Sequence, residues 1–524
     1  MLVFWYVFMV YTLVISQIEA ARILAYFPTP SISHQVVFRP LTQALASRGH
    51  EVVVITTDAA FRKGETPPNL TEIDLHDISY EMWIAEVTKQ KRGFKEDNIL
   101  AQLKSIIRAT TKMFDDQLRD DRIQALIHDK ERKFDLLLLE ALMPPLLAFS
   151  HIYKAPVIQI SSFGATYPNY ESMGAPTHPL LYTTNVRRRL NNITMWEKLT
   201  ELYYHYNAEK IIWDASQNLG DKILKEHFGP DIPPISELIN NVDMLFLNIH
   251  PMFEGIRPVP PSVVHIGGIH QHPTKELPQD LKSYLDLSKH GVIYISFGTN
   301  VDPSLLPPEK IQTLVRVFSQ LPYDVLWKWN KDELPGRTDN IRISKWLPQS
   351  DLLKHPKIKV FITQGGLQST DEAITAGVPL IGMPVLGDQW FNVERYEFFK
   401  IGVKLEIDSL TEEKFKDAIK KTIEDDSYRR NMEHFRSLIQ DAPQSPLERA
   451  VWWTEYVLRH GGAKHLRSPS ANITWTQYLE LELLLTLLAA LVTGVTLIVL
   501  ALRFVYKFVL SNYLGSSDVK IKRN

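Results

Sequence analysis

The chain has 524 residues, of which 45% are hydrophobic and 23% are charged, and its formal net charge is −2. This composition is typical of a globular protein with two to four domains, and the near-zero charge argues against a nucleic-acid partner. Because the sequence contains no cysteine, disulfides, zinc–thiolate sites, iron–sulfur clusters and cysteine nucleophiles are excluded.

The amino terminus is apolar and carries no charged side chain from Met1 to Ile15. Together with the small residues around Ala20, this predicts a secretory signal peptide over residues 1–20. An uncleaved membrane anchor is the alternative, because the amino group is the only positive charge that precedes the apolar run.

The next part of the chain alternates between strand-like and helix-like patterns. Residues 22–27 read as a buried strand, Gln35–Arg48 has helical spacing, and Glu51–Thr57 is a β-branched strand, which together form a βαβ unit. The pattern recurs as strands over 134–139, 156–161 and 243–248 and a helix over 144–153. We therefore predict a Rossmann-like domain with a parallel sheet over residues 21–255.

Two segments, one within this domain and one after it, do not follow the alternation of strands and helices. The stretch from Tyr167 to Pro230 is aromatic, charged and mostly helical in pattern, with Tyr203, Tyr204 and Tyr206 close together. It is interpreted as a lid or acceptor-side insertion, and plain helical packing is the alternative. Residues 256–290 are rich in proline and glycine and are interpreted as a linker.

A second α/β series follows and predicts a second Rossmann-like domain over residues 291–445. Its expected strands cover 291–298, 324–329, 357–363, 378–384 and 402–407, and its expected helices cover 308–321, 369–376 and 388–400. The predicted fold class is thus α/β, with two Rossmann-like domains that face a cleft.

The C-terminal part predicts a membrane anchor. Residues 446–480 contain an amphipathic stretch, Pro446–Arg459, which we expect to close the fold, and residues 481–505 contain twenty uncharged residues, Leu483–Leu502. Such a helix spans a bilayer core of roughly 30 Å; a soluble buried helix is the alternative. The basic residues that follow place the tail, 506–524, in the cytoplasm and residues 21–480 in the lumen.

Further signals agree with a lumenal position. Asn69, Asn192 and Asn472 each begin an N-x-[ST] sequon, so we predict that they are glycosylated. The last five residues, Lys-Ile-Lys-Arg-Asn, resemble a dilysine-type signal for retrieval to the endoplasmic reticulum, although they could also be a merely basic tail. The expected location is the endoplasmic reticulum membrane, with single-pass type I topology.

The turn between residues 363 and 372 carries the main chemical signal. Gly365 and Gly366 permit a close approach of ligand to backbone, and Ser369 or Thr370 can cap the helix that follows, whose free N–H groups bind anions. The pair Asp388-Gln389 lies at the next strand-to-helix corner, where a carboxylate and an amide can bind sugar hydroxyls. A simple N-cap is the alternative role for Asp388.

In the first domain, the chemical candidate is His34. The segment Ser31–Gln35 is expected to form the turn after the first strand, which places the imidazole at the cleft. Histidine titrates near neutral pH and can remove a proton from an acceptor hydroxyl. A lone histidine is as a rule structural, so the residue by itself leaves both roles open.

The segment FITQGGLQSTDEAITAGVPLIGMPVLGDQWFN, at residues 361–392, resembles the donor-binding signature of the UDP-glycosyltransferases. Residues 345–349 (KWLPQ) and 296–299 (SFGT) match the nucleoside and phosphate elements of that family, and insect members are the most similar. The resemblance covers essentially the whole chain and implies the two-domain fold known as GT-B.

The resemblance also implies a role for each matching donor-site residue. Trp346 would stack on uracil, Gln349 would contact the nucleoside and Glu372 would bind the ribose. The diphosphate would meet the loops around Gly298 and Gly366, and the implied side-chain contacts to it come from Thr299, Gln368 and Ser369. Asp388 and Gln389 would hold the sugar. Gln364 stands where the family commonly has histidine, so it cannot supply a positive charge.

The family's catalytic base matches His34, and its acidic partner matches Glu140, where aspartate is more common. The expected reaction is transfer of a sugar, by resemblance glucose from UDP-glucose, to a small lipophilic acceptor with inversion. The UDP-sugar is a co-substrate, and neither a cofactor nor a metal is expected. A non-catalytic, membrane-anchored binding or receptor protein is the alternative, while a transporter is excluded by the single spanning segment; a homo-oligomer stays open.

Overall fold

The structure is a computed structural model. It describes residues 20–89, 99–129, 131–183, 187, 193–299, 301–471 and 473–518. These belong to two compact units, Met1–Pro469 and Ser470–Asn524. Residues 1–19 of the predicted signal peptide, the sequon residues Asn192 and Asn472, and the last six residues lie outside the described ranges.

The first half of the larger unit is built on a seven-stranded parallel sheet of order β3-β2-β1-β4-β5-β6-β7. Its central strands are buried along their whole length, as expected for a sheet covered on both faces. The strands are β1 Arg22–Phe27, β2 Glu51–Thr56, β3 Leu70–Asp74, β4 Leu136–Glu140, β5 Val157–Ser161, β6 Val242–Leu247 and β7 Val263–His265.

The second half contains a six-stranded parallel sheet of order β10-β9-β8-β11-β12-β13. Its own apolar core packs large side chains such as Trp327 and Phe415. The strands are β8 Val292–Ser296, β9 Asp324–Lys328, β10 Ile341–Ser344, β11 Ile358–Thr363, β12 Leu380–Gly382 and β13 Gly402–Lys404.

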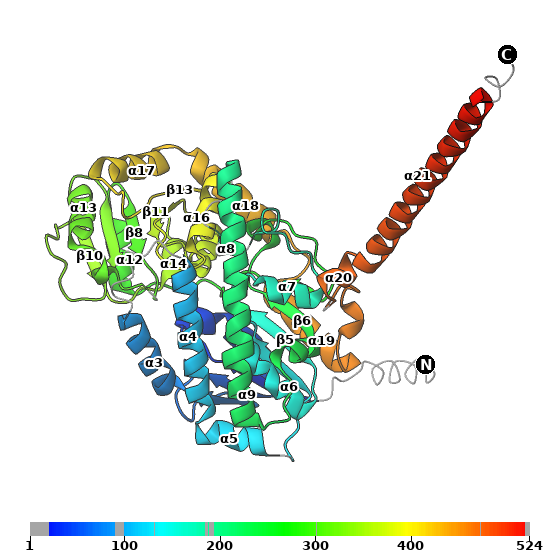
Figure 1. Ribbon diagram of the computed structural model, residues 1–524. Helices are drawn as coiled ribbons and strands as arrows, with labels where there is room; N and C mark the ends of the chain where they lie inside the picture. The colour runs from blue at the N-terminus through cyan, green and yellow to red at the C-terminus, as the bar shows by residue number, and fades with distance from the viewer. Residues whose placement is uncertain are drawn as a thin grey trace, which may run out of the picture. The chain divides into compact units, whose positions relative to one another are not determined.

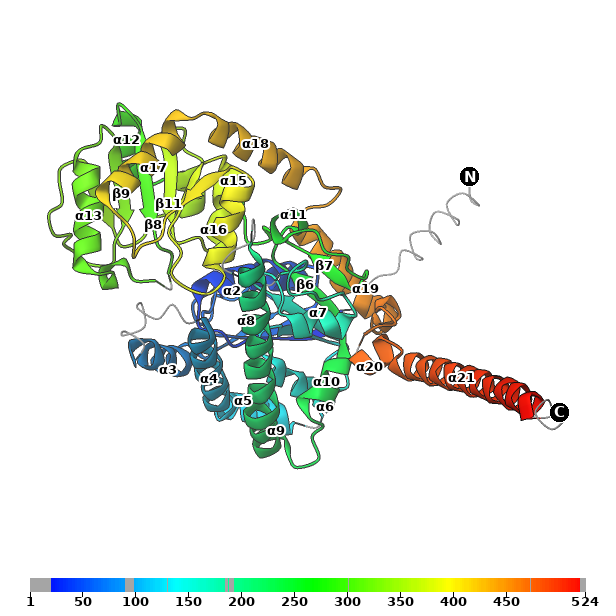
Figure 2. The same cartoon turned by 45° about the horizontal axis from the view of Figure 1, so that its top comes forward.

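Helices surround both sheets (Figures 1 and 2). Those of the first half, with the connection to the second, are α2 Ile32–Ser47, α3 His76–Lys89, α4 Ile99–Leu118, α5 Asp121–His128, α6 Ala148–Tyr153, α7 Tyr167–Met173, α8 Met195–Asp214, α9 Asp221–Phe228, α10 Ile235–Leu238, α11 Pro251–Glu254 and α12 Gln279–Leu287. Those that follow are α13 Pro308–Ser319, α14 Gln349–Leu353, α15 Leu367–Ala376, α16 Gln389–Phe398, α17 Glu412–Glu424, α18 Ser427–Gln440 and α19 Pro446–His460.

Each sheet has one topological switch point. In the first sheet the order reverses between β1 and β4, and in the second between β8 and β11. Parallel sheets of this kind bind ligands outside the carboxyl ends of the strands at the switch point, because the connecting helices there leave in opposite directions. The two switch points carry the loop before His34, Glu140, the Gly298 loop and the Gly365-Gly366 turn, which are the segments that the sequence singled out.

Several boundaries differ from the expectation. The helix α2 begins at Ile32, so His34 lies in its first turn rather than in a loop. The interval 256–290, interpreted as a linker, contains α12 and also β7, which pairs with β6 and extends the first sheet beyond residue 255. These two elements are only three and nine residues long, too short for a periodic pattern to show.

The last helix of the larger unit, α19, returns to the first half. Its apolar side chains belong to the core beside β1 and α2. Glu455 accepts a hydrogen bond of 2.8 Å from Arg48, and Arg449 donates to the carbonyl of His265. The predicted closing helix is therefore present, and its contacts attach the end of the second half to the first.

The smaller unit holds α20, Trp475–Tyr478, and α21, Leu481–Asp518. Within the described ranges, the segment Leu481–Tyr513 of α21 meets the length and polarity needed for a membrane span. The helix continues beyond residue 505, where the predicted span ends, because the residues that follow also favour helix.

Candidate active site

His34 is fixed by two oxygens at the switch point of the first sheet. Its Nδ1 lies 3.2 Å from Glu140 Oε1 and 3.0 Å from the hydroxyl of Ser162. Glu140 ends β4 with its side chain fully buried. The second Glu140 oxygen accepts from the backbone N–H of Thr29 at 3.2 Å. With Nδ1 held in this way, Nε2 is the nitrogen that can act as a base.

In the second half, the turn after β11 brings backbone to the front of α15. Gly365 has φ +91°, and a Cβ there would come within 2.5 Å of Val393 on α16. Gly366 is the N-cap residue of α15, because the helix begins at Leu367. The expected cap by Ser369 or Thr370 is therefore wrong, since both lie inside the first turn. The glycine cap leaves the front of the helix open to an anion.

Three residues with implied nucleoside and phosphate roles form one hydrogen-bonded group. The amide of Gln349 donates to Glu372 at 2.7 Å and to the hydroxyl of Ser369 at 2.9 Å. The Gln349 carbonyl accepts from the hydroxyl of Tyr294 at 2.8 Å. Burial raises the pKa of Glu372 to about 7, against the Gln349 hydrogen bond, which lowers it. This group can therefore bind a ribose diol best when the carboxyl has lost its proton.

Gln364 lies between the glycines of both loops. A Cβ on Gly298, at φ +74°, would meet its amide nitrogen at 2.3 Å, and one on Gly366 would meet it at 3.1 Å. The side chain of Gln364 is buried. Its amide thus lies between the loops that follow β8 and β11, at the switch point of the second sheet. Thr299, the next residue of the β8 loop, is exposed.

Lys328 supplies a cation to this region, and the sequence analysis missed it. It ends β9, donates to the carbonyl of Gly298, and its Nζ lies 5.7 Å from the ring centre of Trp346. Burial lowers its pKa, and Asp302 opposes that shift. The only indication of Lys328 in the sequence is a lysine between two tryptophans at the end of the expected strand DVLWKW. Trp346 itself is 66% exposed, so its ring face is available for stacking.

Asp388 and Gln389 lie at the start of α16. Asp388 occupies the N-cap position but makes no capping bond; instead, it accepts from Asn392 at 2.8 Å, so the simple N-cap alternative is wrong. Burial raises the pKa of Asp388 to about 6, and the charge of His34 opposes the shift. The Gln389 carbonyl accepts from the N–H groups of Val385 and Leu386, so its amide group is the part left for a sugar.

Gln368 connects the two halves. It lies in the first turn of α15, and its side-chain amide donates to the carbonyl of Ser162 at 2.9 Å. The sequence predicted that this side chain binds the diphosphate. In the structure it points to the loop that carries the Ser162–His34 contact.

The segment interpreted as a lid is helical, as expected, and consists mainly of α7, α8 and α9. The helix α8 has no buried residue, and Tyr203 and Tyr206 are 62% and 70% exposed, as is Trp196 at 76%. Plain packing into a core therefore does not explain these aromatic side chains. Tyr167 of α7 makes an edge contact with His205 of α8, which ties these two helices together.

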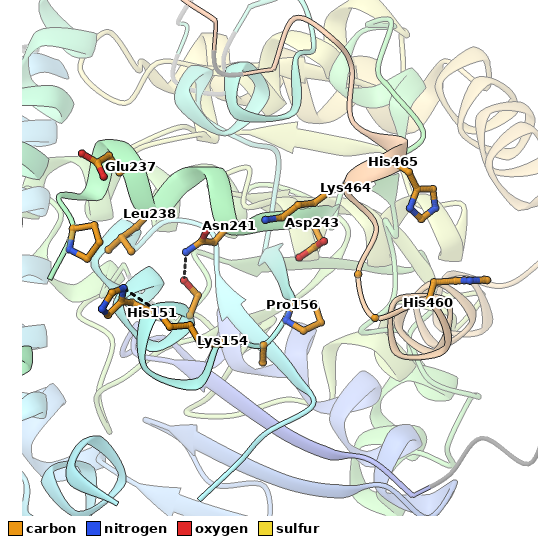
Figure 3. Close-up of a pocket in the computed structure, with 15 residues that line it drawn as sticks. His151, Lys154, Pro156, Glu237, Leu238, Asn241, Asp243, His460, Lys464 and His465 are labelled. Atoms are coloured by element: carbon orange, nitrogen blue, oxygen red, sulfur yellow. Dashed lines mark hydrogen bonds between the residues drawn. The ribbon is translucent and has the colours of Figure 1, made fainter. Parts of the chain in front are cut away.

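A cavity of about 590 Å³ lies elsewhere, at the amino ends of β5 and β6 (Figure 3). Lys154 stands at the C-terminal end of α6, where positive charge compensates the helix dipole, and His460 is the last residue of α19. Asp243 accepts from the N–H groups of Val157 and Ala463. These contacts attach the C-terminal segment to the sheet, at the edge opposite His34, and so the cavity is not the candidate active site.

One group in the described ranges has the composition of a metal site: Asp115, Glu226 and His227. Arg119 pairs with both carboxylates, at 3.0 and 2.7 Å, and so already offsets part of their charge. The group lies on α4 and α9, away from both switch points. Of the predicted sequons, Asn69 is exposed at φ 64° in the turn before β3.

Comparison with known proteins agrees with this geometry. Residues 23–514 match the family model described as UDP-glucoronosyl and UDP-glucosyl transferase. A protein named ecdysteroid UDP-glucosyltransferase, from Lymantria dispar multicapsid nuclear polyhedrosis virus, is 38% identical over 485 residues, which cover 90% of this chain and 94% of that protein. UDP-glucosyltransferase 2 of Dactylopius coccus is 30% identical over 525 residues, 98% of each chain.

Solved structures show the same architecture. UDP-glucose: anthocyanidin 3-O-glucosyltransferase in complex with UDP aligns with a TM-score of 0.57 at 16% identity, over 84% of this chain and all of that one. Spinosyn forosaminyltransferase aligns with a TM-score of 0.54 at 18% identity, over 84% and 99%. The fold is that of the GT-B glycosyltransferases, and the chain belongs to the UDP-glucuronosyl and UDP-glucosyl transferase family.

Proposed function

We propose that this glycosyltransferase moves glucose from UDP-glucose to a hydroxyl of a small lipophilic acceptor, with inversion and with His34 as the base. The observation that carries this proposal is the arrangement of His34 between Glu140 and Ser162, with Asp388 of the donor half within electrostatic reach. This arrangement supports His34 as the base and Asp388 as a residue on the sugar side.

In the reaction, Nε2 of His34 takes the proton of the acceptor hydroxyl while its oxygen attacks the anomeric carbon. The new C–O bond forms on the face opposite the bond to phosphate, which breaks and leaves its electron pair on UDP. Glu140 accepts from Nδ1 and stabilises the imidazolium that forms. Holding both substrates in one cleft supplies proximity.

The donor half is suited to stabilise the leaving UDP. Its charge grows at the front of α15, where backbone N–H groups and the helix dipole favour an anion. Lys328 beside the Gly298 loop adds a positive charge, which offsets the absence of histidine at position 364. The side chains of Gln364, Thr299 and Ser369 complete the proposed contacts to phosphate.

For the acceptor, the relatives support a lipophilic alcohol. The viral relatives are named for ecdysteroids, so a steroid hydroxyl belongs in the test panel beside simple phenols, plant toxins and cyanohydrins. The membrane-span candidate in α21 supports an enzyme that meets acceptors dissolved in a bilayer. We propose that it resides in the endoplasmic reticulum as a type I protein with glycosylated Asn69, Asn192 and Asn472.

The test is transfer from several UDP-sugars to this acceptor panel by microsomes that contain the full chain, read by mass spectrometry. His34→Ala should lower kcat by a factor of about 10² to 10⁴, as expected for loss of a general base, without lowering UDP affinity. His128→Ala, at an exposed histidine of α5, is the control. Unchanged transfer by His34→Ala would refute the base, and UDP binding without transfer to any acceptor would favour the binding-protein alternative.

A further inference from the structure

The next inference rests on the proposed role of His34 and concerns Ser162, a residue that no motif singled out. Ser162 follows β5 and is fully buried. Its hydroxyl lies 3.0 Å from His34 Nδ1, closer than Glu140 Oε1 at 3.2 Å. Two oxygens therefore compete for one ring nitrogen, and their chemistry decides where the ring proton lies.

An ionised carboxylate can only accept a hydrogen bond, whereas a hydroxyl can accept or donate. With Glu140 ionised, Nδ1 must carry the proton, and Ser162 then accepts from the same N–H. If the hydroxyl donated to Nδ1 instead, the proton would move to Nε2 and His34 could not act as a base. The role of the hydroxyl thus depends on how the Ser162 backbone is held.

The Ser162 backbone is held from both halves of the larger unit. Its carbonyl accepts from the side-chain amides of Asn248 and Gln368, each at 2.9 Å. Asn248, which follows β6, is itself fixed by the N–H of Gly268 at 3.1 Å. Gln368 belongs to the first turn of α15, where the diphosphate is proposed to bind. One residue therefore touches the base through its hydroxyl and the donor half through its carbonyl.

We propose that Ser162 is a positioning residue that holds His34 as a base and makes this orientation depend on the donor half through Gln368. With the Gln368 contact in place, the Ser162 hydroxyl faces Nδ1 as an acceptor. Without the Gln368 contact, the Ser162 carbonyl is held by Asn248 alone. The Ser162 hydroxyl then loses its fixed orientation toward the His34 ring. Binding of the donor at α15 is then coupled to the orientation of His34 as a base.

The first test is Ser162→Ala in the full-length, membrane-bound enzyme. It should lower kcat about three- to tenfold, the usual effect of one lost hydrogen bond, while UDP affinity stays unchanged. The matched control is Ser161→Ala. Ser161 is equally buried, and its hydroxyl serves only the loop, donating to Gly164 and accepting from Phe163. If Ser162 merely stabilised the loop, both variants would lose the same activity, and the proposal would be overturned.

The second test is the pH profile of kcat/KM. The charged groups that face His34 are Glu140 from β4 and Asp388 at the start of α16, and Ser162→Ala leaves both in place. Loss of an acceptor at Nδ1 destabilises the imidazolium, so the acidic limb should move to lower pH by about 0.3 to 1 unit. Ser162→Thr, which keeps the hydroxyl, should restore the wild-type limb. A limb that does not move contradicts the proposal.

The third test addresses coupling across the cleft. Gln368→Ala should raise the donor KM and lower kcat, and its effect on kcat should shrink in the Ser162→Ala background, because the path to His34 is already broken. Strictly multiplicative effects would refute the coupling. If Ser162→Ala does not fold, Ser162→Cys, with a weak acceptor of similar size, takes its place. Failure of His34→Ala to lower kcat would instead refute the proposed base, so the two failures are distinguishable.

Discussion

The donor half contains three carboxyl groups with little access to water, at Asp371, Glu372 and Asp388. Burial raises the pKa of Asp388 to about 6 and that of Glu372 to about 7, and it raises the pKa of the adjacent Asp371 well above its usual range. Within the described residues, no lysine, arginine or histidine forms an ion pair with any of them, although Lys354 and His272 lower the pKa of Glu372 from a distance. Their ionisation is therefore sensitive to any group that binds beside them.

We predict that UDP-glucose affinity rises with pH because of Glu372. Below its pKa of about 7 the carboxyl is protonated and accepts ribose hydroxyls poorly, while above that value the ionised form accepts both. Affinity should fall about tenfold from pH 8 to pH 6, the scale of one charged hydrogen bond. Calorimetric titration with UDP-glucose checks this, because the donor's diphosphate does not titrate in that range.

Glu372→Gln is the control for this prediction. It should bind the donor weakly at every pH and show a flat profile. In the wild-type protein, stability should change with pH in the opposite direction to donor affinity. A carboxyl with a raised pKa binds its proton more tightly in the folded state, so the free energy of unfolding falls as pH rises from about 4 to 7. If the donor affinity of Glu372→Gln still depended on pH, a group other than Glu372 would be responsible for that dependence.

At the scale of elements, the donor site depends on how closely α16 approaches the turn before α15. Gly365 and Gly382 both face Val393 of α16, where a Cβ on either glycine would lie about 2.5 Å from a Val393 methyl group. Asn392 adds a hydrogen bond of 2.9 Å to the carbonyl of Gly365. The glycines thus set the distance between the two helix starts that are proposed to hold the diphosphate and the sugar.

Gly365→Ala should therefore destabilise the protein by about 2 to 4 kcal/mol and weaken UDP binding. The cost combines strain at φ +91° with overpacking against Val393. Gly49→Ala is the control, because Gly49 has φ +96° but no atom within 4 Å of the added Cβ, so it reports the strain alone, about 1 to 2 kcal/mol. Equal shifts of the two variants in thermal unfolding would show that packing against α16 is unimportant.

At the scale of the whole molecule, the larger unit joins its halves through side-chain to backbone contacts. Arg395 of α16 donates to the carbonyls of Met252 and Phe253 in α11, and Gln271 donates to the carbonyl of Asp371. With the Gln368–Ser162 contact, these bonds join the first half to the second. The smaller unit contributes α21, whose apolar side chains are exposed.

We predict that α21 is what retains the protein in membranes. The full chain should stay in the pellet after alkaline carbonate extraction, whereas a chain that ends at Pro469 should be released and should keep its UDP affinity. Transfer of about 20 apolar residues into a bilayer core is effectively irreversible. A truncated chain that remained in the pellet would contradict this and would place a second membrane contact within residues 20–469, where α8 exposes Trp196, Tyr203 and Trp213.

The sequence predicted the strands at both switch points because buried parallel strands are continuous apolar runs, as in β1, β4 and β11. It did not reveal β3, β7 or β10, which have three to five residues and partly exposed side chains. It also placed the starts of α2 and α15 too late, because Ile32 and Leu367 follow residues that favour turns. Local pattern thus located the elements but not their ends.

By itself, the sequence determined the family, the two α/β halves, the apolar C-terminal helix and most of the donor-site candidates, since these depend on motifs contiguous in the chain. Only the tertiary structure brought His34, Glu140 and Ser162 to one point, Asp388 within electrostatic reach of His34, and Lys328 beside Gly298. These contacts join residues 30 to 354 positions apart. They arise from strand order and side-chain packing, which no local pattern encodes.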